Sequence, residues 1–381
     1  MTVDTTHAFF RATTALARDL AVLAARCVST AEPVTALDVL SGSGIRAARY
    51  LAHANAKRVV ANDISTRTRV AANLAAVAAD GAWETTHEDG CRLLSRLALD
   101  GQTFTVVDID GFGSAGVPSV SLALGCVRWG GLLVLNSTDW AGLSGRESSS
   151  TIAAYGAVVH ACPSAPENAL RVLLGSAARD AAQRGMHVHP VLSYAAPGPA
   201  YRVIVRVTRG DSASMTQRLG FNCFCKRCGA TWHTSWAALG SAGGCRHCGS
   251  RSDVLVNGPL WSGPLHDADM LRSMESDAAS LGWLADEPGK QASASLASLF
   301  TLLREEAGAC GLVPFYLRLD QVGRAANLSQ QPSREALSRA LAGRGFSVTR
   351  SQCDAAALRT DAPWEDVLQA AKDTAAGRLM R

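Results

Sequence analysis

The sequence lacks long apolar runs and a strong excess of either charge. No stretch approaches the ~18 consecutive apolar residues of a membrane-spanning helix, so we expect no membrane partner. Residues Met1–Phe10 do not place an apolar core behind a basic segment, which predicts no secretory signal. The cytoplasm is therefore the expected location, with a nuclear or organellar one left open. The net charge of +4 permits nucleic-acid binding without identifying it, so the partner has to be inferred from the sites.

A disulfide framework is also missing. The chain has 11 cysteines, and most stand singly in apolar runs, as Cys27, Cys126 and Cys310 do, which predicts reduced core residues. Hydrophobic residues make up 48% of the sequence and charged residues 18%, as is usual for a globular protein. At 381 residues the chain is long enough for two domains. Nothing in the composition indicates an obligate protein partner.

The first half of the sequence alternates short apolar segments with helical patterns. Strands separated by helices predict an α/β fold with a parallel sheet and helices on both faces, as in Rossmann-like proteins. We expect strands over 34–40, 58–61, 104–109, 131–136, 188–194 and 200–208, and a long alanine-rich helix over 65–79.

The character of the sequence changes near residue 210. A polar linker leads into a cysteine- and glycine-rich module at about 220–252, and helices dominate beyond it. The pattern over 332–350 is typical of a helix that runs into a short strand. We therefore predict two domains, 1–210 and 211–381, the second an α+β domain that carries a zinc-ribbon-like module.

The first predicted strand ends in a glycine turn, Asp38-Val-Leu-Ser-Gly-Ser-Gly-Ile-Arg46. Gly42 and Gly44 let the backbone turn tightly and approach a ligand closely. Their spacing alone also fits a dinucleotide site. Asp38 favours S-adenosylmethionine, because methyltransferases commonly keep an acid at this strand end and dinucleotide-binding strands are usually apolar there. We place Arg46, which closes the motif, in the same cofactor site.

Two further acids extend the predicted cofactor site. Asp63 ends the second predicted strand, where a carboxylate can accept hydrogen bonds from both ribose hydroxyls. Asp89, followed by Gly90, lies in the loop before the third predicted strand and is placed to meet the adenine amine. The alternative is that Asp63 and Asp89 are only helix N-caps or turn residues.

The third predicted strand ends in Asp108-Ile-Asp110 and continues into Gly111-Phe112-Gly113-Ser114. An exocyclic amine on a purine is a poor nucleophile, because its lone pair is delocalised into the ring. Asp110 and the carbonyl of Gly111 could accept its two hydrogens and favour the pyramidal form, while Phe112 stacks on a base taken out of its helix. The alternative is a glycine turn with Phe112 in the core. The prediction requires the ends of the first and third predicted strands to meet.

Four cysteines form two pairs, Cys225-x-x-Cys228 and Cys245-x-x-Cys248, separated by 16 residues. This spacing is typical of a structural zinc site with four thiolate ligands, and a glycine follows each pair to turn the chain back. A closed site of this kind has no position for substrate, so Zn²⁺ is predicted to be structural. Cys223, His233 and His247 are alternative ligands that would break the paired spacing.

Together these motifs resemble the tRNA (guanine-N2)-dimethyltransferase family, which modifies the guanine at position 26 of tRNA. The resemblance extends over essentially the whole chain, and the segments toward the C-terminus contribute most of its specificity. It includes Ala17-Arg18-Asp19-Leu20, Leu40–Arg46, Asn62-Asp63-Ile64, Asp108–Ser114, Ser137-Thr138-Asp139, Leu143-Ser-Gly145, Gly258–Leu265, Gly345–Arg350 and Leu358–Pro363.

The resemblance implies a tRNA methyltransferase with S-adenosylmethionine as cofactor, Asp110 as the catalytic residue, and one or two methyl groups added to guanine 26. It also implies that the C-terminal domain holds tRNA, with arginines contacting phosphates; the alternative is a solvated helix face. The family usually has proline where Gly111 stands. The residues that it assigns to the cofactor are Arg18, Ser43, Asp63, Asp89 and Gly90, and the arginines are Arg324, Arg334, Arg339, Arg344 and Arg350.

Three other functions remain open on the sequence. A methyltransferase could act on an adenine amine or on ribosomal RNA, and the modified nucleoside would distinguish these. A non-catalytic RNA-binding relative with the same fold would not bind S-adenosylmethionine, although Asp38, Asp63 and Asp110 argue against it. A dehydrogenase is the least supported, because no proton-relay residues accompany the glycine turn.

Overall fold

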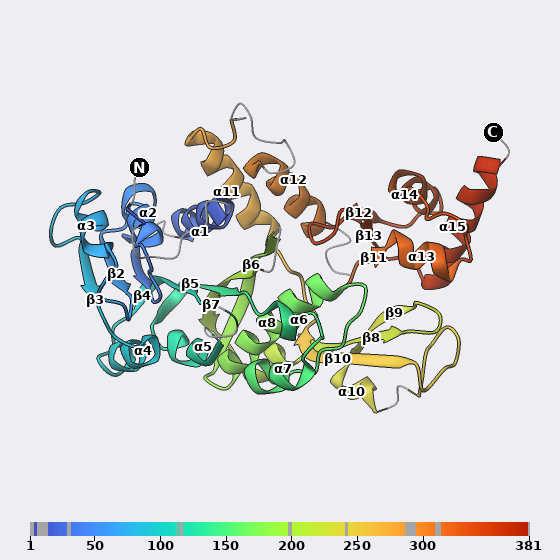
Figure 1. Cartoon of the computed structure of the whole chain (residues 1–381), viewed down its shortest axis with the longest axis horizontal. Helices are drawn as coiled ribbons and strands as arrows, with labels where there is room; N and C mark the ends of the chain where they lie inside the picture. The colour runs from blue at the N-terminus through green and yellow to red at the C-terminus, as the bar shows by residue number, and fades with distance from the viewer. Residues whose placement is uncertain are drawn as a thin grey trace. The chain divides into compact units, whose positions relative to one another are not determined.

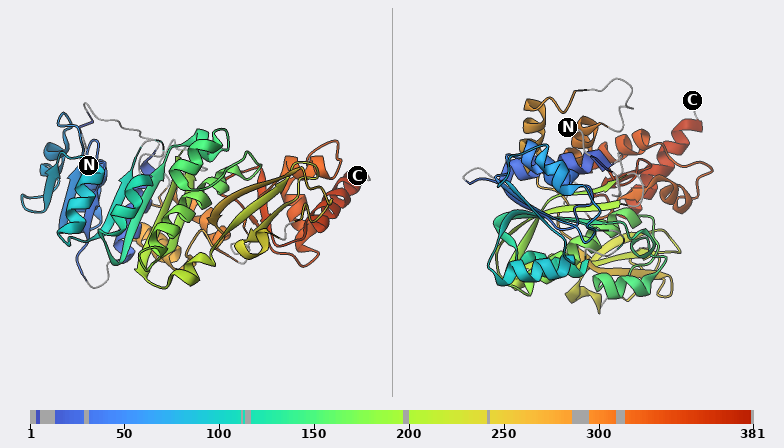
Figure 2. Two further views of the ribbon diagram at one scale, coloured as in Figure 1. Left: turned by 90° about the horizontal axis from the view of Figure 1, so that it is seen from below. Right: turned by 60° about the vertical axis from the view of Figure 1, so that its left-hand side comes forward.

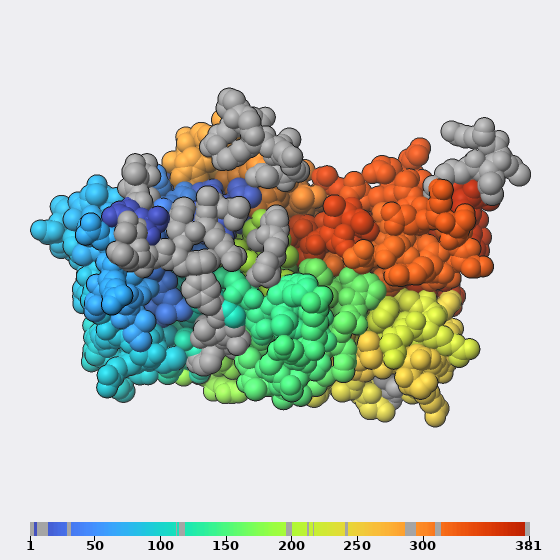
Figure 3. All heavy atoms as spheres, viewed as in Figure 1, coloured from blue at the N-terminus to red at the C-terminus, as the bar shows by residue number. Residues whose placement is uncertain are grey.

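The structure is a computed structural model that describes residues 4–5, 14–28, 32–111, 113, 117–196, 200–240, 243–285, 295–308 and 314–379. Figure 3 shows all heavy atoms, with the remaining residues in grey. The chain forms two compact units, each built from three chain segments. The first unit comprises residues 1–139, 177–215 and 269–300, and the second 140–176, 216–268 and 301–381.

A seven-stranded sheet with the order β3-β2-β1-β4-β5-β7-β6 forms the centre of the first unit. Neighbouring strands are parallel from β3 to β5, and β7 is antiparallel to β5 and to β6. The predicted α/β fold is confirmed. The strands are β1 (Thr35–Asp38), β2 (Arg58–Asn62), β3 (Trp83–Thr86), β4 (Phe104–Asp110), β5 (Val127–Ser137), β6 (Met186–Ala196) and β7 (Ala200–Arg209).

Helices cover both faces of this sheet. Figure 1 shows α1 and α2 above the sheet and α4 and α5 below it, and Figure 2 shows the strands between these helical layers. Central strands are apolar on both faces, as buried parallel strands must be, and Leu37, Val107 and Leu133 are fully buried. The helices of this unit include α1 (Ala15–Val28), α2 (Ile45–His53), α3 (Val70–Ala75), α4 (Gly90–Leu99), α5 (Val117–Leu124), α9 (Ser212–Thr216) and α11 (Ala268–Ser280).

The sequence prediction was wrong at one edge of the sheet. Strand β3 and helix α4 lie between the second and third predicted strands, where we expected a loop. The predicted helix over 65–79 is only the short α3. Alanine favours helix locally, but this segment buries only Val70, Asn73 and Leu74, which leaves little apolar surface to stabilise a longer helix.

The second unit holds two small sheets, β10-β8-β9 and β11-β13-β12. The predicted cysteine module spans the hairpins of the first sheet, and the predicted helix and strand over 332–350 are α14 and β12. The strands are β8 (Leu219–Cys225), β9 (Thr231–Ser235), β10 (Val254–Trp261), β11 (Leu317–Arg318), β12 (Val348–Arg350) and β13 (Ala357–Thr360). The helices are α6 (Trp140–Leu143), α7 (Ser148–Tyr155), α8 (Ala165–Ala182), α10 (Trp236–Leu239), α12 (Leu296–Ala307), α13 (Leu319–Ala325), α14 (Arg334–Ala342) and α15 (Trp364–Leu379), of which α8 and α12 each extend into the first unit.

A buried carboxylate connects all three segments of the second unit. Glu167 on α8 accepts hydrogen bonds from the backbone amides of Phe315 and Tyr316, at 2.9 and 3.0 Å, and forms ion pairs with Arg171 and Arg359. Arg171 also donates to the carbonyl oxygen of Trp261 at 3.0 Å. Burial alone would raise the pKa of Glu167, but the two arginines outweigh burial and lower this pKa to about 2.

Among the described residues, none of the helices combines the length and the apolar character that crossing a membrane requires.

Candidate active site at the carboxyl edge of the sheet

The predicted cofactor and catalytic segments lie at the same edge of the sheet. Strand β1 pairs with β2 on one side and with β4 on the other, and Asp38 is in register with Asp108. The prediction that the ends of β1 and β4 meet is therefore confirmed. Open parallel sheets bind ligands outside the carboxyl ends of their strands, and Asp38, Asp63 and Asp110 all lie there.

The glycine turn after β1 depends on backbone conformations that other residues rarely adopt. Gly42 and Gly44 have φ angles of +57° and +77°. A Cβ atom on Gly44 would lie 3.0 Å from Cγ1 of Val70, so a side chain would also meet α3. The amide of Gly42 donates to Oδ2 of Asp63 at 2.8 Å, which fixes the turn against the end of β2. The side chain of Ser43 is buried within this turn.

The two acids assigned to adenosine have different local structures. Asp63 accepts from the amide of Ser65 at 2.9 Å and is also bonded to the glycine turn, so its carboxylate lies directly beside the predicted cofactor site. Asp89 is the N-cap of α4, and its Oδ1 accepts from the amides of Cys91 and Arg92, each at 3.0 Å. The N-cap alternative thus describes its local geometry, and Gly90 begins the helix. Adenine recognition by Asp89 stays a prediction.

Arg46 and two acids form a buried ion-pair cluster behind the site. Arg46 lies 3.2 Å from Oδ2 of Asp108 and forms a second, shorter ion pair with Asp110. Tyr50 donates its hydroxyl hydrogen to Asp108 at 2.8 Å. Arg46 therefore holds the two carboxylates at the end of β4, and its predicted contact with the cofactor remains a prediction.

The environments of Asp38 and Asp110 move their pKa values in opposite directions. Burial, followed by the charge of Asp108, raises the pKa of Asp38 to about 7. Burial also acts on Asp110, but Arg46 and Arg202 outweigh it, and the pKa of Asp110 is lowered. Asp110 is therefore an anion near neutral pH, while Asp38 exchanges a proton there.

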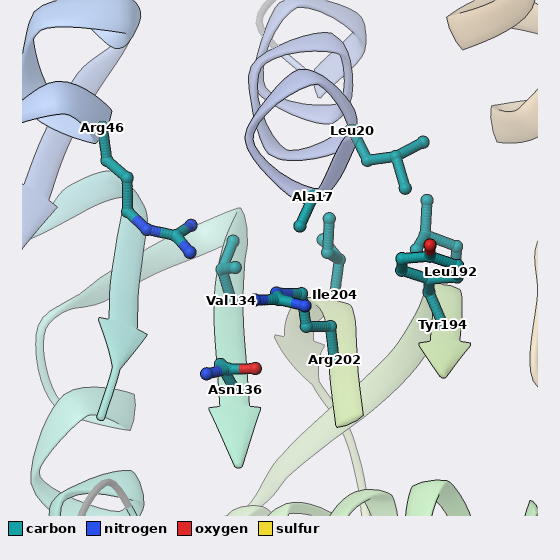
Figure 4. Close-up of a pocket in the computed structure, with 9 residues that line it drawn as sticks. All are labelled: Ala17, Leu20, Arg46, Val134, Asn136, Leu192, Tyr194, Arg202 and Ile204. Atoms are coloured by element: carbon teal, nitrogen blue, oxygen red, sulfur yellow. The ribbon is translucent and has the colours of Figure 1, made fainter. Parts of the chain in front are cut away.

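A narrow recess lies beside Asp110 in the first unit. Figure 4 shows α1 on one side and three strands of the sheet, β5, β7 and β6, on the other. We call this cavity the recess. It is lined by Ala17, Leu20, Arg46, Val134, Asn136, Leu192, Tyr194, Arg202 and Ile204.

Sequence reasoning missed Asn136, Arg202 and Tyr50, which surround the two carboxylates of β4. Arg202 had a detectable signal, because it is a charged residue inside the otherwise apolar stretch from Ala200 to Val205. Such a residue in a central strand is buried and needs a partner. Asn136 and Tyr50 carried no comparable signal, since their relation to Asp110 arises only from strand register and helix packing.

Of the remaining predicted site residues, the structure describes Arg18 and Gly111. Arg18 on α1 is 7% exposed, and its Nη1 donates to Oγ1 of Thr14 at 2.5 Å. Burial, followed by the charges of Arg46 and Arg49, lowers the pKa of Arg18 to about 10. Gly111 is buried directly after β4. Phe112 lies outside the described residues, so its stacking role stays a prediction.

The four paired cysteines form a cluster in the second unit. The sulfur atoms of Cys225, Cys228, Cys245 and Cys248 all lie within 4.8 Å of one another. A tetrahedral zinc ion with Zn–S distances of ~2.3 Å needs sulfurs about 3.8 Å apart, and the pairs Cys225–Cys248 and Cys228–Cys245 are separated by 3.7 and 3.4 Å. Cys223, His233 and His247 are not part of the cluster.

The two cysteine turns also repeat the same backbone hydrogen bonds. The amide of Gly229 donates to the carbonyl of Cys225, and that of Gly249 donates to Cys245, each at 2.9 Å. Both glycines have positive φ angles, 77° and 72°, that bring each chain back after its second sulfur. The donor set and the geometry thus fit a structural zinc ion with no free position for substrate.

Most of the C-terminal arginines are neutralised locally. Arg324, Arg344 and Arg350 form ion pairs with Asp320, Asp373 and Glu305, respectively, and Arg334 pairs with Glu335. Arg339 donates weakly to the carbonyl of Glu335, at 3.4 Å. Phosphate contacts by these arginines stay predictions and would require some of these pairs to open.

The fold and the site together define a class, the S-adenosylmethionine-dependent methyltransferases with a Rossmann-like sheet. A family model described as N2,N2-dimethylguanosine tRNA methyltransferase matches residues 1–372. The chain belongs to this family.

Similar proteins are found in archaea and eukaryotes. The chain is 30% identical over 367 residues to a tRNA (guanine(26)-N(2))-dimethyltransferase of Aeropyrum pernix, covering 93% of this chain and 86% of that one. A human protein of the same name is 30% identical over 360 residues, and the match spans 87% of this chain but only 52% of the human one. The solved structure of Trm1 from Pyrococcus horikoshii with S-adenosyl-L-methionine has a TM-score of 0.80 at 23% identity, covering 97% of this chain and 96% of that one.

Proposed function

We propose that the protein transfers one or two methyl groups from S-adenosylmethionine to the exocyclic N2 of a guanine in tRNA, the guanine at position 26 that the names of its relatives specify. The observation that carries this proposal is the position of Asp110. Its carboxylate is ionised, is 26% exposed, and lies at the end of β4 next to both the glycine turn and the recess.

The residues at the carboxyl edge fit S-adenosylmethionine. The glycine turn adopts positive φ angles at Gly42 and Gly44 that keep its backbone free of side chains, and the Asp63 carboxylate lies against this turn, where ribose hydroxyls could donate to it. When bound, the cofactor would supply an electrophilic methyl group on a sulfonium, and the sulfur would keep the electron pair of the broken S–CH3 bond. Arg18 and Ser43, both buried beside the same edge, are the further residues that we assign to holding it.

Asp110 acts on the amine that receives the methyl group. As an anion it accepts a hydrogen bond from the amine, and the carbonyl of Gly111 accepts the second hydrogen, which favours the pyramidal and nucleophilic form. One N–H proton is lost as each N–C bond forms, and the partly exposed Asp110 carboxylate can pass it to water. Because its pKa is low, Asp110 contributes mainly by position and charge.

The test uses unmodified tRNA transcripts with guanine or adenine at position 26. After incubation with labelled S-adenosylmethionine, the RNA is digested to nucleosides and the methylated products are identified by mass spectrometry. We expect N2-methylguanosine and N2,N2-dimethylguanosine from the guanine transcript and neither product from its adenine counterpart. Label in an adenosine product, or in ribosomal RNA alone, would assign a different substrate. An absence of both transfer and cofactor binding would favour a non-catalytic relative.

A further inference from the structure

Four strands of the first unit place polar side chains in one row. The sheet register pairs Asp110 with Asn136, Asn136 with Arg202, and Arg202 with Tyr194. Paired residues on neighbouring strands point to the same face of a sheet. The row therefore runs across β4, β5, β7 and β6 on one face and forms the polar rim of the recess, as Figure 4 shows for its last three members.

The adjacent row on the same face is apolar beyond β4. Val134 pairs with Ile204, and Ile204 pairs with Leu192. With Ala17 and Leu20 of α1 opposite, these side chains give the recess two apolar walls beneath its polar rim. Two apolar walls with a polar edge suit a planar, hydrogen-bonding ligand. The recess is narrow, so it would receive an edge of such a ligand.

The rim contains buried polar atoms without hydrogen-bond partners among the described residues. They are Oδ1 of Asn136 and both Nε and Nη1 of Arg202. These side chains are 7% and 6% exposed, so water does not readily replace the missing partners. Buried polar groups in native proteins are nearly always hydrogen-bonded, and such a group at a recess indicates that a ligand completes the bonding.

The orientation of Asn136 sets the order of donors and acceptors along the rim. Its amide nitrogen bonds to Asp110, and Figure 4 shows its oxygen on the side of Arg202. From β4 to β7 the rim thus presents an acceptor, a second acceptor and then a donor. Two strand spacings of ~4.8 Å separate the Cα atoms of Asp110 and Arg202 by about 10 Å. This span can hold one edge of a purine with a hydrogen bond at each end.

We propose that Asn136 and Arg202 read the Watson–Crick edge of the target guanine, an inference that rests on the proposed function. That edge presents the N2 amine, N1–H and O6, which are a donor, a donor and an acceptor. Asp110 accepts from the amine, Oδ1 of Asn136 accepts from N1–H, and Arg202 donates to O6. Adenine would set an unprotonated ring nitrogen against the Asn136 oxygen, and two acceptors would then face each other.

The guanidinium of Arg202 could instead bind a different acceptor, the carboxylate of the cofactor. Binding of guanine and binding of the cofactor carboxylate by Arg202 predict different results, because only guanine recognition depends on the identity of the base. The experiment therefore compares transcripts that carry guanine or 2-aminopurine at position 26, made by ligation. The 2-aminopurine keeps the reacting amine but lacks N1–H and O6. Cofactor affinity is measured separately by calorimetry.

For the wild-type chain we expect kcat/KM to favour guanine over 2-aminopurine by on the order of 100-fold or more. Arg202→Met removes the donors while keeping much of the side-chain volume, and it should reduce this preference by roughly 10- to 100-fold while cofactor affinity stays unchanged. Asn136→Leu, which removes the other reading group, should also reduce it. Arg209→Met, an exposed arginine on the same strand, is the matched control and should keep the wild-type preference.

The outcomes separate the two proposals. A wild-type chain that methylates no guanine overturns both. A chain that methylates guanine, but whose folded Arg202→Met and Asn136→Leu variants keep the wild-type base preference, overturns the inference alone. Loss of cofactor affinity in Arg202→Met with an unchanged base preference would assign Arg202 to the cofactor. Circular dichroism shows whether each variant is folded, and either variant alone is sufficient for the comparison.

Discussion

Asp38 and Asp110 lie at the ends of neighbouring strands, yet they have different chemical states. Asp38 is fully buried, and Ser41 donates to its Oδ2 at 2.8 Å, while Oδ1 has no partner among the described residues. Asp110 is partly exposed and bonded to Arg46. The pKa of Asp38 thus lies near neutral pH, whereas Asp110 is ionised there. The proposed site requires a hydrogen-bond acceptor that is always available, and the ionised Asp110 is such an acceptor.

Replacing Asp110 with asparagine tests the catalytic assignment. Asp110→Asn keeps the size of the side chain but removes its charge, and its amide can donate where the carboxylate only accepts. We expect methyl transfer to fall by about 10²- to 10⁴-fold, as for loss of a positioned acid–base group, with cofactor affinity retained. Labelled transfer and calorimetry measure these two effects. The exposed Asp80→Asn is a matched control that should keep full activity, and an active Asp110→Asn would remove Asp110 from the mechanism.

The raised pKa of Asp38 predicts how stability depends on pH. The folded chain holds this proton up to pH about 7, whereas an unfolded aspartate releases it near pH ~4. The stabilising contribution of Asp38 is therefore full below pH ~4 and is lost as the pH rises through about 7. Asp38→Asn should not show this loss. Between pH 5 and 8 the unfolding free energy of wild type should fall relative to that of the variant by on the order of 2 kcal/mol.

Urea unfolding followed by circular dichroism at the two pH values measures this difference. Parallel pH profiles for the wild-type and Asp38→Asn chains would show that Asp38 is ionised throughout the range.

Among the individual residues of the site, the sequence predicted the acidic side chains but not the residues that bond to them. Asp38, Asp63 and Asp110 could be located because each ends or directly follows a strand, and strand ends are visible in the hydrophobic pattern. Asn136 and Arg202 join Asp110 only through the pairing of β4 with β5 and of β5 with β7. Register between distant strands is not encoded in the local pattern, so this part of the site required the structure.

Among the elements, the cysteine turns were the most predictable, because their spacing and following glycines specify local geometry directly. Strand β3 and helix α4 were the least predictable. The residues of β3 are only partly buried, so this edge strand lacks a continuous apolar run. We expected a loop in this region and placed Asp89 directly before a strand, whereas Asp89 is the N-cap of helix α4.

Removing one zinc ligand tests the cysteine turns. Cys245→Ser leaves three thiolates, and we expect bound zinc to fall from about one ion per chain to near zero, together with a lower unfolding temperature, because structural zinc contributes folding free energy directly. Elemental analysis and thermal unfolding measure the two effects. Cys223→Ser is the matched control, since Cys223 is buried nearby but lies outside the cluster. Equal zinc loss in both variants would contradict the assignment of ligands.

At the scale of the whole molecule, the Glu167 cluster holds together distant parts of the chain. Glu167→Gln keeps the shape but leaves the buried Arg171 and Arg359 without their shared carboxylate. Breaking a buried ion pair in this way costs about 3–5 kcal/mol, far more than losing a surface pair. We expect a decrease of this size in the unfolding free energy from urea titration. Glu365→Gln, at an exposed position in the same unit, should leave the unfolding free energy nearly unchanged, and equal stability of both variants would contradict the role of the cluster.

The interleaving of the two units bears on how the chain can fold during synthesis. The first unit includes α11, whose Asp277 pairs with Arg26 on α1, and this helix is made only after the cysteine turns of the second unit. The strands of the first unit therefore leave the ribosome before α11, the last helix of this unit, and the intervening residues of the second unit are translated in between. Fragments that end before residue 300 would lack part of the first unit. We therefore do not expect such fragments to replace the full chain in expression experiments.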